Sequence, residues 1–387
     1  MPDVVVVGAG PAGAVAATVL ARAGHKVLLL ERMRMPRAKL CGDTLNPGAM
    51  ALLRRLRLEQ TAESRGLRID GMRVTGEGAV SVEATYPASL AGRAISRSEF
   101  DASLVAEAVR AGAEYEDGVH VRAPILERDA HGDRVVGVSV GADRALRQIR
   151  STVIIAADGR HSTIAFALGL ARHPGRPRRW AIGAYFEGVY GNTSRGEMHI
   201  RSGHYLGLAP LPDGLTNVCL VQPVGNADHT LRNPAAGLLA EVALEPELRD
   251  RMSSARTVTP TRVLGPLAVD LVPEVVPPRG LLLAGDACGF VDPMTGDGLR
   301  FAIRGGELAA EAARRALGQG WAGVHDQLAA ERAREFALKW RFNRTLRALV
   351  GSPVGVWAAT RSARLAPSVV RALITRASDC DIALASA

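Results

Sequence analysis

The stretch that decides the fold lies close to the N-terminus and reads Val4-Val5-Val6-Val7-Gly8-Ala9-Gly10-Pro11-Ala12-Gly13. The valines predict a buried strand, and the alanine-rich residues from Pro11 to Gly24 predict a helix. Gly8 permits the tight turn between them, Gly10 lets the backbone approach a pyrophosphate, and Gly13 lets the helix pack closely on the strand. Free N–H groups at the start of this helix would bind the pyrophosphate. The stretch therefore predicts a dinucleotide-binding turn.

An acidic residue completes this pattern. The next apolar segment, Lys26 to Leu30, predicts a second strand that ends in Glu31, at the spacing of about 20 residues beyond the glycines that is typical of dinucleotide sites. A carboxylate at this point binds both hydroxyls of a ribose. The same charge disfavours a ribose with a 2′-phosphate, so we do not expect NADP as the ligand of this turn.

A second glycine-rich segment, Gly285 to Gly298, stands almost 280 residues later and again follows an apolar run. Asp286 comes directly after the predicted strand Leu281 to Ala284, where a lone carboxylate is costly unless it is hydrogen-bonded. Gly296 and Gly298 precede a strong helix and expose backbone N–H groups at its positive end. Two such segments in this order suggest one dinucleotide held at both ends, and we expect FAD.

The composition favours an ordinary globular protein with two joined lobes. The 387 residues exceed one typical domain, and 47% of them are apolar and 22% charged. The net charge of +9 comes from 45 Arg and 3 Lys scattered along the chain, and aromatic residues make up only 4%. We therefore expect no nucleic-acid partner. An anionic substrate or a membrane surface stays open as a partner.

The cysteines and the first residues indicate a cytoplasmic protein. The four cysteines lie far apart, without the spacing of a zinc site or a redox disulfide, so we expect reduced thiols and no metal. The chain runs directly into a strand, which predicts no signal peptide. Apolar and arginine positions alternate from Arg361 to Arg376. That pattern permits peripheral contact with a membrane, although we favour a helix packed on the domain.

The order of the predicted elements gives an α/β protein with a discontinuous nucleotide domain. We expect residues 1–75, 95–175 and 275–320 to form a Rossmann-type FAD-binding domain, because each glycine segment follows an apolar strand. Residues 76–94 and 176–274 contain alternating strands, typical of an antiparallel β-sheet, and form an inserted substrate domain. Residues 321–387 predict a helical C-terminal segment.

This order of motifs resembles the flavoprotein monooxygenases of the p-hydroxybenzoate hydroxylase type (group A), which share a fold with geranylgeranyl reductases. The resemblance covers essentially the whole chain. It rests on the glycine fingerprint with Glu31, on Asp158-Gly159, on Gly285-Asp286 and on Pro293-x-x-Gly296-x-Gly298. It implies a glutathione reductase-like FAD-binding domain.

The resemblance also implies roles for single residues. Asp286 would bind the ribityl chain, Arg37 and Arg97 would contact FAD, and Asp158-Gly159 would lie near both FAD and NADH or NADPH. The arginine that usually ends this last motif is replaced by Ala165, which leaves the choice of nicotinamide open. The expected catalytic positions are Pro293, Gly296 and Cys41. The expected FAD-binding residues are Gly8, Gly10, Pro11, Ala12, Gly13, Glu31, Arg32, Arg37, Cys41, Gly42, Arg97, Val121, Asp158, Gly159, Gly285, Asp286, Pro293, Gly296, Asp297, Gly298 and Leu299.

The reaction is less sharply indicated than the cofactor. The segments Lys39 to Asp43 and Gly289 to Pro293 resemble the reductase branch. Prenyl reductases carry a Tyr-x-Trp-x-Phe-Pro motif, and the stretch Tyr205 to Pro210 lacks its tryptophan and phenylalanine. Flavin-dependent halogenases need a lysine in the channel and a Trp-x-Trp-x-Ile-Pro motif. With three lysines and no such motif, we disfavour halogenation.

These observations lead to three hypotheses. The first is a monooxygenase that uses NAD(P)H and hydroxylates an aromatic or lipid-like small molecule through a flavin hydroperoxide. The second is a geranylgeranyl reductase-like enzyme that hydrogenates C=C bonds of prenyl lipids. The third is a catalytically inactive FAD-binding protein. We favour the monooxygenase, with a hydrophobic or aromatic small-molecule substrate and no obligate protein partner.

Overall fold

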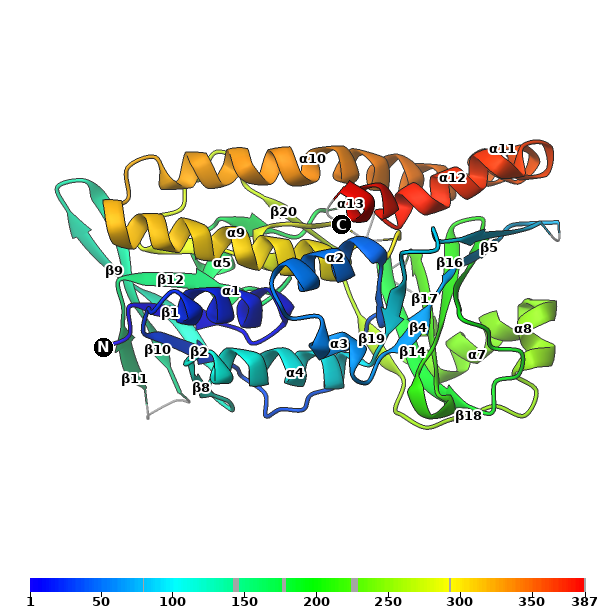
Figure 1. The fold of residues 1–387 in the computed structure, drawn as a ribbon, viewed down its shortest axis with the longest axis horizontal. Helices are drawn as coiled ribbons and strands as arrows, with labels where there is room; N and C mark the ends of the chain where they lie inside the picture. The colour runs from blue at the N-terminus through cyan, green and yellow to red at the C-terminus, as the bar shows by residue number, and fades with distance from the viewer. Residues whose placement is uncertain (79, 142–145, 176–178, 224–228, 292–293, 386–387) are drawn as a thin grey trace.

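The computed structural model describes residues 1–78, 80–141, 146–175, 179–223, 229–291 and 294–385. Two sheets lie side by side along the longest axis, and the helix α10 (Val324–Val350) runs across both of them (Figure 1). None of the helices in the described part of the chain combines the length and apolar character that a membrane span requires.

The first sheet is parallel and carries the glycine turn at its centre. Its five strands stand in the order β21 (Leu281–Leu283), β12 (Val153–Ala156), β1 (Val4–Val7), β2 (Val27–Leu30) and β8 (Glu114–Glu116). The strands β1, β2, β12 and β21 are buried throughout, as apolar runs in a sheet covered on both faces should be.

Helices cover one face of this sheet, and an antiparallel sheet covers the other. The helices are α1 (Pro11–Arg22), α4 (Arg97–Arg110) and α9 (Gly298–Gln319), which share one apolar core with β1. The opposite face packs against β9 (Val121–Asp129), β10 (Gly132–Val140), β11 (Arg147–Arg150) and α5 (Thr163–Ala167).

The second sheet has eight strands and is antiparallel except where β15 meets β5. Its order is β18 (Arg256–Thr257), β14 (Arg179–Glu187), β17 (Thr216–Pro223), β16 (His204–Pro210), β15 (Arg195–Arg201), β5 (Gly71–Thr75) and β6 (Ser81–Thr85), with β19 (Arg262–Leu264) paired to β14. The helices α6 (His229–Arg232), α7 (Pro234–Leu244) and α8 (Pro246–Arg251) follow β17, and α7 and α8 pack on one face of the sheet.

Short elements join the two sheets. The strands β3 (Thr44–Leu45), β7 (Gly92–Ala94) and β4 (Leu67–Ile69) form one small sheet, with α2 (Pro47–Arg55) and α3 (Gln60–Glu63) beside it. The strands β13 (Ala171–Arg172), β20 (Ala268–Leu271) and β22 (Phe290–Val291) form another. Two short 3₁₀ turns, Pro212–Gly214 and Gly285–Cys288, complete the chain between strands.

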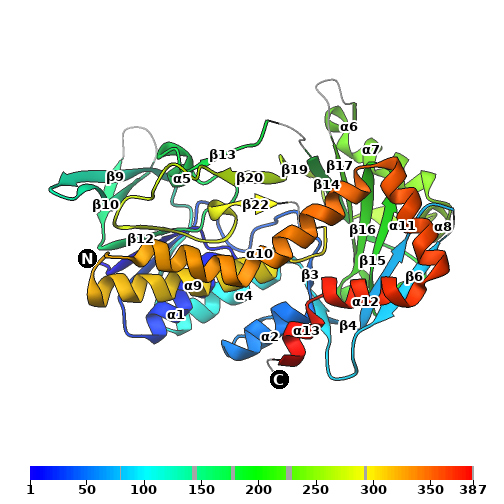
Figure 2. The ribbon, with the colours of Figure 1, turned by 90° about the horizontal axis from the view of Figure 1, so that it is seen from above.

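After α10 the chain turns back along the second sheet as α11 (Pro353–Leu365) and α12 (Pro367–Ala377), and then as α13 (Cys380–Ala385) beside α2 (Figure 2). Proline begins both α11 and α12, where its missing N–H costs nothing. The segment from Arg361 to Arg376 is therefore two helices broken at Ala366.

The mixed α/β class with a parallel sheet is confirmed. The structure differs from the sequence-based expectation at β5, which lies inside the segment 1–75 that we assigned to the nucleotide domain. It pairs with β6 and β15 of the second sheet. The sequence of a strand does not show which distant strand it pairs with, because the same residues suit either sheet.

Candidate functional site

The glycine turn after β1 is shaped by close backbone contacts. Gly8 has φ +97°, and a Cβ added there would lie 2.5 Å from the carbonyl oxygen of Ala157. A Cβ on Gly13 would lie 1.9 Å from the carbonyl oxygen of Gly8, so α1 packs directly on the turn. A Cβ on Gly10 would meet only Nη2 of Arg37, at 3.6 Å, and no side chain caps the helix that it begins. Its free N–H groups are therefore available to a ligand, as a pyrophosphate requires.

Glu31 is held in place at the end of β2. Its Oε2 accepts a hydrogen bond from the Ala9 N–H at 3.0 Å, and its Oε1 accepts one from the Met33 N–H at 3.1 Å. Arg37 lies 3.4 Å from the same carboxylate through Nε, and its Nη2 lies 3.2 Å from Oδ2 of Asp101. The acid predicted to bind a ribose is thus oriented by backbone donors beside the turn.

Arg97 and Asp101 form a buried ion pair one turn apart on α4. The guanidinium donates two parallel bonds, from Nε to Oδ1 at 2.7 Å and from Nη2 to Oδ2 at 2.8 Å. Arg97 also hydrogen-bonds the thiol of Cys41. Burial raises the pKa of that thiol, and the arginine opposes the rise. Arg97, Cys41 and the adjacent Gly42 all line the cavity described below.

Asp43 lies beside this pair and was missed in the sequence analysis. It is fully buried with φ +53°, and its carboxylate accepts hydrogen bonds from Asn217 Nδ2 at 2.8 Å and from the Arg97 N–H at 3.3 Å. Tyr185 donates its hydroxyl to the same group. Burial raises the pKa of Asp43 to about 7, and Tyr185 and Arg97 limit the rise. Asn217 and Tyr185 come from the second sheet and lie far from Asp43 in sequence, so no local motif predicts this cluster.

The fold brings the two glycine segments together. Gly285 has φ +60°, and a Cβ there would lie 2.9 Å from the Cβ of Ala12. A Cβ on Gly306 of α9 would lie 2.2 Å from the carbonyl oxygen of Ala12. Asp286 is half-buried and lines the cavity with Gly296, Gly298 and Leu299. Pro293 lies outside the described residues.

Asp297 is bound by the protein itself. Its Oδ1 accepts a hydrogen bond from Asn46 Nδ2 at 3.0 Å and lies 3.3 Å from Lys339 Nζ, and its Oδ2 accepts one from Asn343 Nδ2 at 3.2 Å. Asp379 accepts hydrogen bonds from the same two side chains, from Lys339 Nζ to Oδ1 at 2.8 Å and from Asn46 Nδ2 to Oδ2 at 3.2 Å. Burial raises the pKa of Asp297 to about 7, and Lys339 opposes the rise. This cluster joins α2, α9, α10 and the start of α13.

The remaining predicted cofactor residues lie in different surroundings. Asp158 accepts a bond from the Thr163 N–H at 2.7 Å through Oδ2, whereas its buried Oδ1 has no hydrogen-bond partner among the described residues. Gly159, with φ +84°, lines the cavity. Val121 is buried in the apolar core under the parallel sheet, and Arg32 is exposed at the end of β2.

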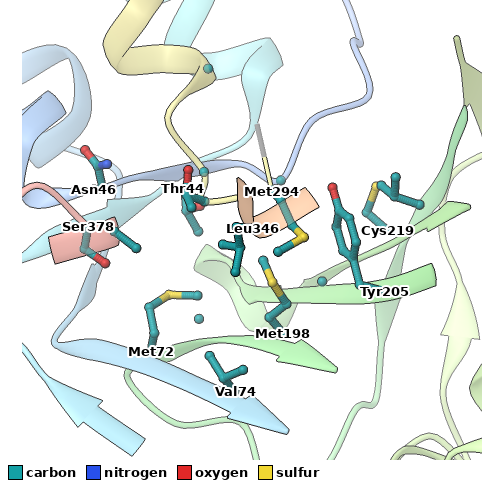
Figure 3. Close-up of a pocket in the computed structure, with 18 of the residues that line it drawn as sticks. Thr44, Asn46, Met72, Val74, Met198, Tyr205, Cys219, Met294, Leu346 and Ser378 are labelled. Atoms are coloured by element: carbon teal, nitrogen blue, oxygen red, sulfur yellow. The ribbon is translucent and has the colours of Figure 1, made fainter. Parts of the chain in front are cut away.

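A single cavity of about 740 Å³ begins at the glycine turns and extends beneath the C-terminal helices. Its near end is bounded by Gly10, Pro11, Gly285 and Asp286, and its far end is lined almost entirely by apolar side chains. Met72, Met198, Met294 and Leu346 converge on its middle (Figure 3). The far end is lined by Val74, Val82, Leu349, Val356, Ala363, Val370 and Ile374.

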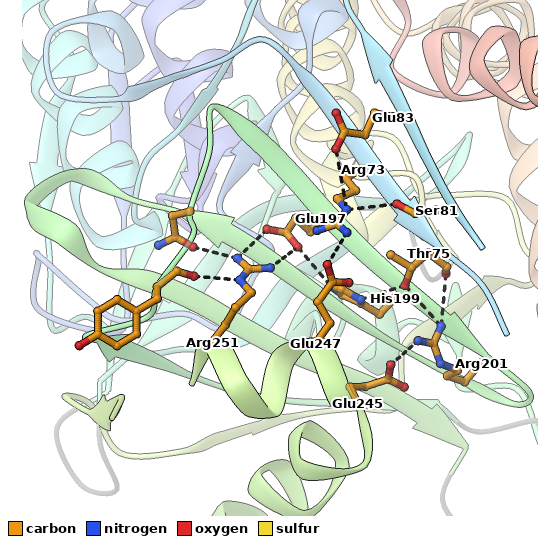
Figure 4. Close-up of polar contacts among 12 residues, drawn as sticks. Arg73, Thr75, Ser81, Glu83, Glu197, His199, Arg201, Glu245, Glu247 and Arg251 are labelled. Atoms are coloured by element: carbon orange, nitrogen blue, oxygen red, sulfur yellow. Dashed lines mark hydrogen bonds and ion pairs between the residues drawn. The ribbon is translucent and has the colours of Figure 1, made fainter. Parts of the chain in front are cut away.

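The β15 residue His199 belongs to a polar cluster on the second sheet. His199 is buried and contacts Thr75 Oγ1 at 2.9 Å and Glu197 Oε2 at 3.3 Å (Figure 4). Arg251 of α8 donates two 2.8 Å bonds to the same glutamate. Burial would raise the pKa of Glu197, but the bonds from His199 and Arg251 lower it to about 2. Side chains alternate along a strand, so this cluster points away from Met198 and fixes α8 to the sheet.

Comparison with known proteins identifies the class. The family described as FAD binding domain matches residues 1–229. The chain therefore belongs to the superfamily of FAD-dependent oxidoreductases that includes the geranylgeranyl reductases, as the motifs predicted.

Individual relatives and solved structures resemble the chain over most of its length. The chain is 32% identical to menaquinone reductase of Mycolicibacterium smegmatis, over 80% of this chain and 75% of that protein. It is 31% identical to digeranylgeranylglycerophospholipid reductase 1 of Methanopyrus kandleri, over 81% of each. Among solved structures, the flavin-dependent brominase Bmp2 matches with a TM-score of 0.80 at 23% identity, covering 98% of this chain and 94% of that one. This last likeness shows the fold.

Proposed function

We propose that this protein is an FAD-dependent reductase that hydrogenates a C=C bond in the isoprenoid chain of a lipid or quinone. The observation that carries the proposal is the cavity, which is long, apolar and continuous with the glycine turns. A greasy chain gains free energy by leaving water for such a lining. Two relatives at 31–32% identity are named as reductases of a quinone and of a digeranylgeranyl lipid. These relatives do not specifically support the monooxygenase that we favoured from the sequence.

The residues at the near end of the cavity fit FAD. We assign the parallel sheet to a Rossmann-type FAD-binding domain and the second sheet to an inserted substrate domain. Gly10 and Gly285 would bring backbone to the pyrophosphate, Glu31 would accept ribose hydroxyls, and Asp286 would bind the ribityl chain. Bound FAD supplies two-electron chemistry at its ring. We expect NADH or NADPH as the electron donor.

The residues further along the cavity would hold the substrate. The three methionines Met72, Met198 and Met294 are flexible and polarisable, which suits a bent apolar chain. The same lining excludes water from the reacting bond. Saturating a C=C bond also consumes a proton. Asp43 lines the cavity and has a pKa of about 7, so we assign it to hold that proton at its carboxyl group.

The altered prenyl-reductase motif changes the shape of this wall. Gly207 and Ala209 stand where the motif has tryptophan and phenylalanine. Gly207 lines the cavity, and a Cβ on it would meet only the carbonyl oxygen of Cys219, at 3.9 Å. We infer that the missing tryptophan widens the cavity next to Tyr205 and admits a substrate broader than a bare polyprenyl chain.

The proposal is tested by the mass of the product. The FAD-loaded protein would be reduced with dithionite and incubated without oxygen with a menaquinone or a digeranylgeranyl lipid, and then in parallel under ¹⁸O₂ with NADH or NADPH. A product heavier by two hydrogens supports the reductase. Incorporation of ¹⁸O supports the monooxygenase instead. FAD binding without any change of either substrate class would favour the inactive FAD-binding protein.

A further inference from the structure

The positive charge of the chain is concentrated near its C-terminus. Residues 336–378 contain eight basic residues and no Asp or Glu. The whole chain has 48 basic and 39 acidic residues, which leaves 40 basic and 39 acidic residues elsewhere. One segment therefore carries nearly all of the net charge of +9. Lys339 pairs with Asp297 and Asp379, so the seven arginines of the segment form the excess that points to an anionic partner.

The same segment exposes large apolar side chains. On α11, Val354, Trp357 and Leu365 are 73%, 59% and 78% exposed, and on α12, Val369 and Leu373 are 57% and 47% exposed. The spacings 354, 357, 365 and 369, 373 place each set on one face of its helix. Arg361, Arg364 and Arg376 are exposed among them, and Arg371 is exposed on another side of α12. We call these exposed apolar and arginine side chains of α11 and α12 the docking face.

The opposite faces of these two helices cover the cavity. Val356 and Ala363 of α11 and Val370 and Ile374 of α12 line its far end. Arg364 Nη2 donates to the Gly78 carbonyl at 2.5 Å and Arg371 Nε donates to the Glu83 carbonyl at 3.2 Å, which ties both helices to the β5–β6 hairpin. Figure 2 shows the pair at the outer end of the second sheet. A thin helical layer thus separates an apolar cavity from an apolar, basic surface.

We propose that the docking face binds the surface of an anionic phospholipid bilayer. Tryptophan and arginine suit the headgroup region, where an apolar body and a polar end are both satisfied. Arg361 lies 5.7 Å from the centre of the Trp357 ring, so one patch already combines the two chemistries. A second copy of the chain is a poorer occupant, because two such faces would repel each other. Vesicle binding is independent of the proposed function, whereas delivery of an isoprenoid lipid through this layer rests on it.

The test is flotation of the FAD-loaded full-length protein with vesicles of phosphatidylcholine alone or mixed with phosphatidylglycerol. We expect binding to the mixed vesicles that weakens at high salt. Arg361→Glu with Arg376→Glu should lower the partition coefficient by at least roughly 25-fold, since each arginine near an anionic surface contributes about fivefold. Trp357→Ser with Leu365→Ser should also reduce binding. Leu244→Ser on α7 and Arg128→Glu on β9 are matched exposed controls and should bind like wild type.

A spectroscopic readout separates docking from a folding defect. Trp357 should shift its fluorescence to shorter wavelength on vesicle addition, and Trp357→Phe should remove that shift while the other three tryptophans stay silent. The proposal is overturned if wild type does not float with anionic vesicles, or if the control variants lose as much binding as the docking-face variants. It is also overturned if the docking-face variants instead abolish a concentration-dependent dimer. If the wild-type protein binds anionic vesicles but hydrogenates neither substrate, the proposed function is contradicted and the docking proposal is not.

Discussion

Asp43 has a left-handed backbone and a completely buried carboxyl group, whose partners come from α4 and from the second sheet. The backbone conformation and the burial both cost free energy, so the position is explained best by chemistry rather than by packing. Asp43→Asn keeps the shape and removes the proton. We expect at least about a 100-fold lower hydrogenation rate, typical for loss of an acid, with the visible spectrum of bound FAD unchanged. A variant that turns over at the wild-type rate would exclude Asp43 as the proton source.

The same carboxyl group predicts a pH dependence of stability. Its pKa is 3.8 in the unfolded reference and about 7 in the folded protein, so the folded state binds more protons in between. Its stabilising contribution is therefore present below pH 3.8 and is lost as the pH rises to about 7. Asp43→Asn does not titrate. The free energy of unfolding of the variant relative to wild type should rise between pH 5 and 8 by roughly 1–3 kcal/mol in urea titrations. An unchanged difference would contradict the assignment.

Gly207 offers a direct probe of the substrate channel. Because a Cβ there would make only an ordinary contact, 3.9 Å from the Cys219 carbonyl oxygen, and the position lines the cavity, Gly207→Trp should fold and bind FAD. The ring would occupy the cavity next to Tyr205 and raise KM for a wide quinone substrate by about tenfold or more, while a narrow prenyl chain is affected less. Gly175→Ala, at an exposed position without a positive φ where an added Cβ meets nothing within 4 Å, controls for the loss of a glycine. Equal effects on both substrates would refute the widened wall.

At the scale of elements, the contact between α1 and α9 holds the two glycine segments together. Gly306→Ala would push a methyl group to within 2.2 Å of the Ala12 carbonyl oxygen. We expect a loss of about 1–3 kcal/mol in stability from the overpacking, together with weaker FAD binding. Gly318→Ala in the same helix meets nothing within 4 Å and should be neutral or stabilising by up to about 1 kcal/mol. Thermal unfolding with and without added FAD measures both effects.

The elements that could be predicted from the sequence are those defined by local chemistry. The unit β1–α1–β2 with Glu31, and the turn before α9, follow from glycine, apolar and acidic residues at short spacing. The sheet that β5 joins, the cluster around Asp43 and the packing of α11 and α12 over the cavity could not be predicted. Each depends on which distant segment packs nearby, and a single strand or helix pattern does not encode its partner.

Among the individual site residues, too, those with a local role could be predicted and those held by distant segments could not. Gly8, Gly13 and Gly285 are required by backbone approaches that the motif describes, and the structure shows those approaches. Asp297 was grouped with the cofactor residues because it stands beside Gly296 and Gly298. Its carboxylate instead contacts Asn46, Asn343 and Lys339, and two of these lie in a helix that follows it in the chain. The roles of the remaining candidates toward FAD stay predictions.

At the scale of the whole molecule, Lys339 connects parts of the chain that lie far apart in sequence. It contacts Asp297 before α9 and Asp379 before α13, and all three side chains are buried. Lys339→Met would leave buried Asp297 without its cation, whereas Asp379 keeps Arg300 at 3.6 Å, and we expect a cost of about 3–5 kcal/mol in urea denaturation. Lys26→Met at the exposed start of β2 should cost far less. A small and equal effect of both substitutions would contradict the structural role of this cluster.

The cluster of Asn46, Asp297, Lys339 and Asp379 has a consequence for biosynthesis. Asn46 stands 333 residues before Asp379, so the hydrogen bond between them forms only after both have been synthesised. We therefore expect that a nascent chain that has not yet exposed Asp379 holds its cofactor weakly, and that firm capture follows when this late segment closes against the early glycine turn.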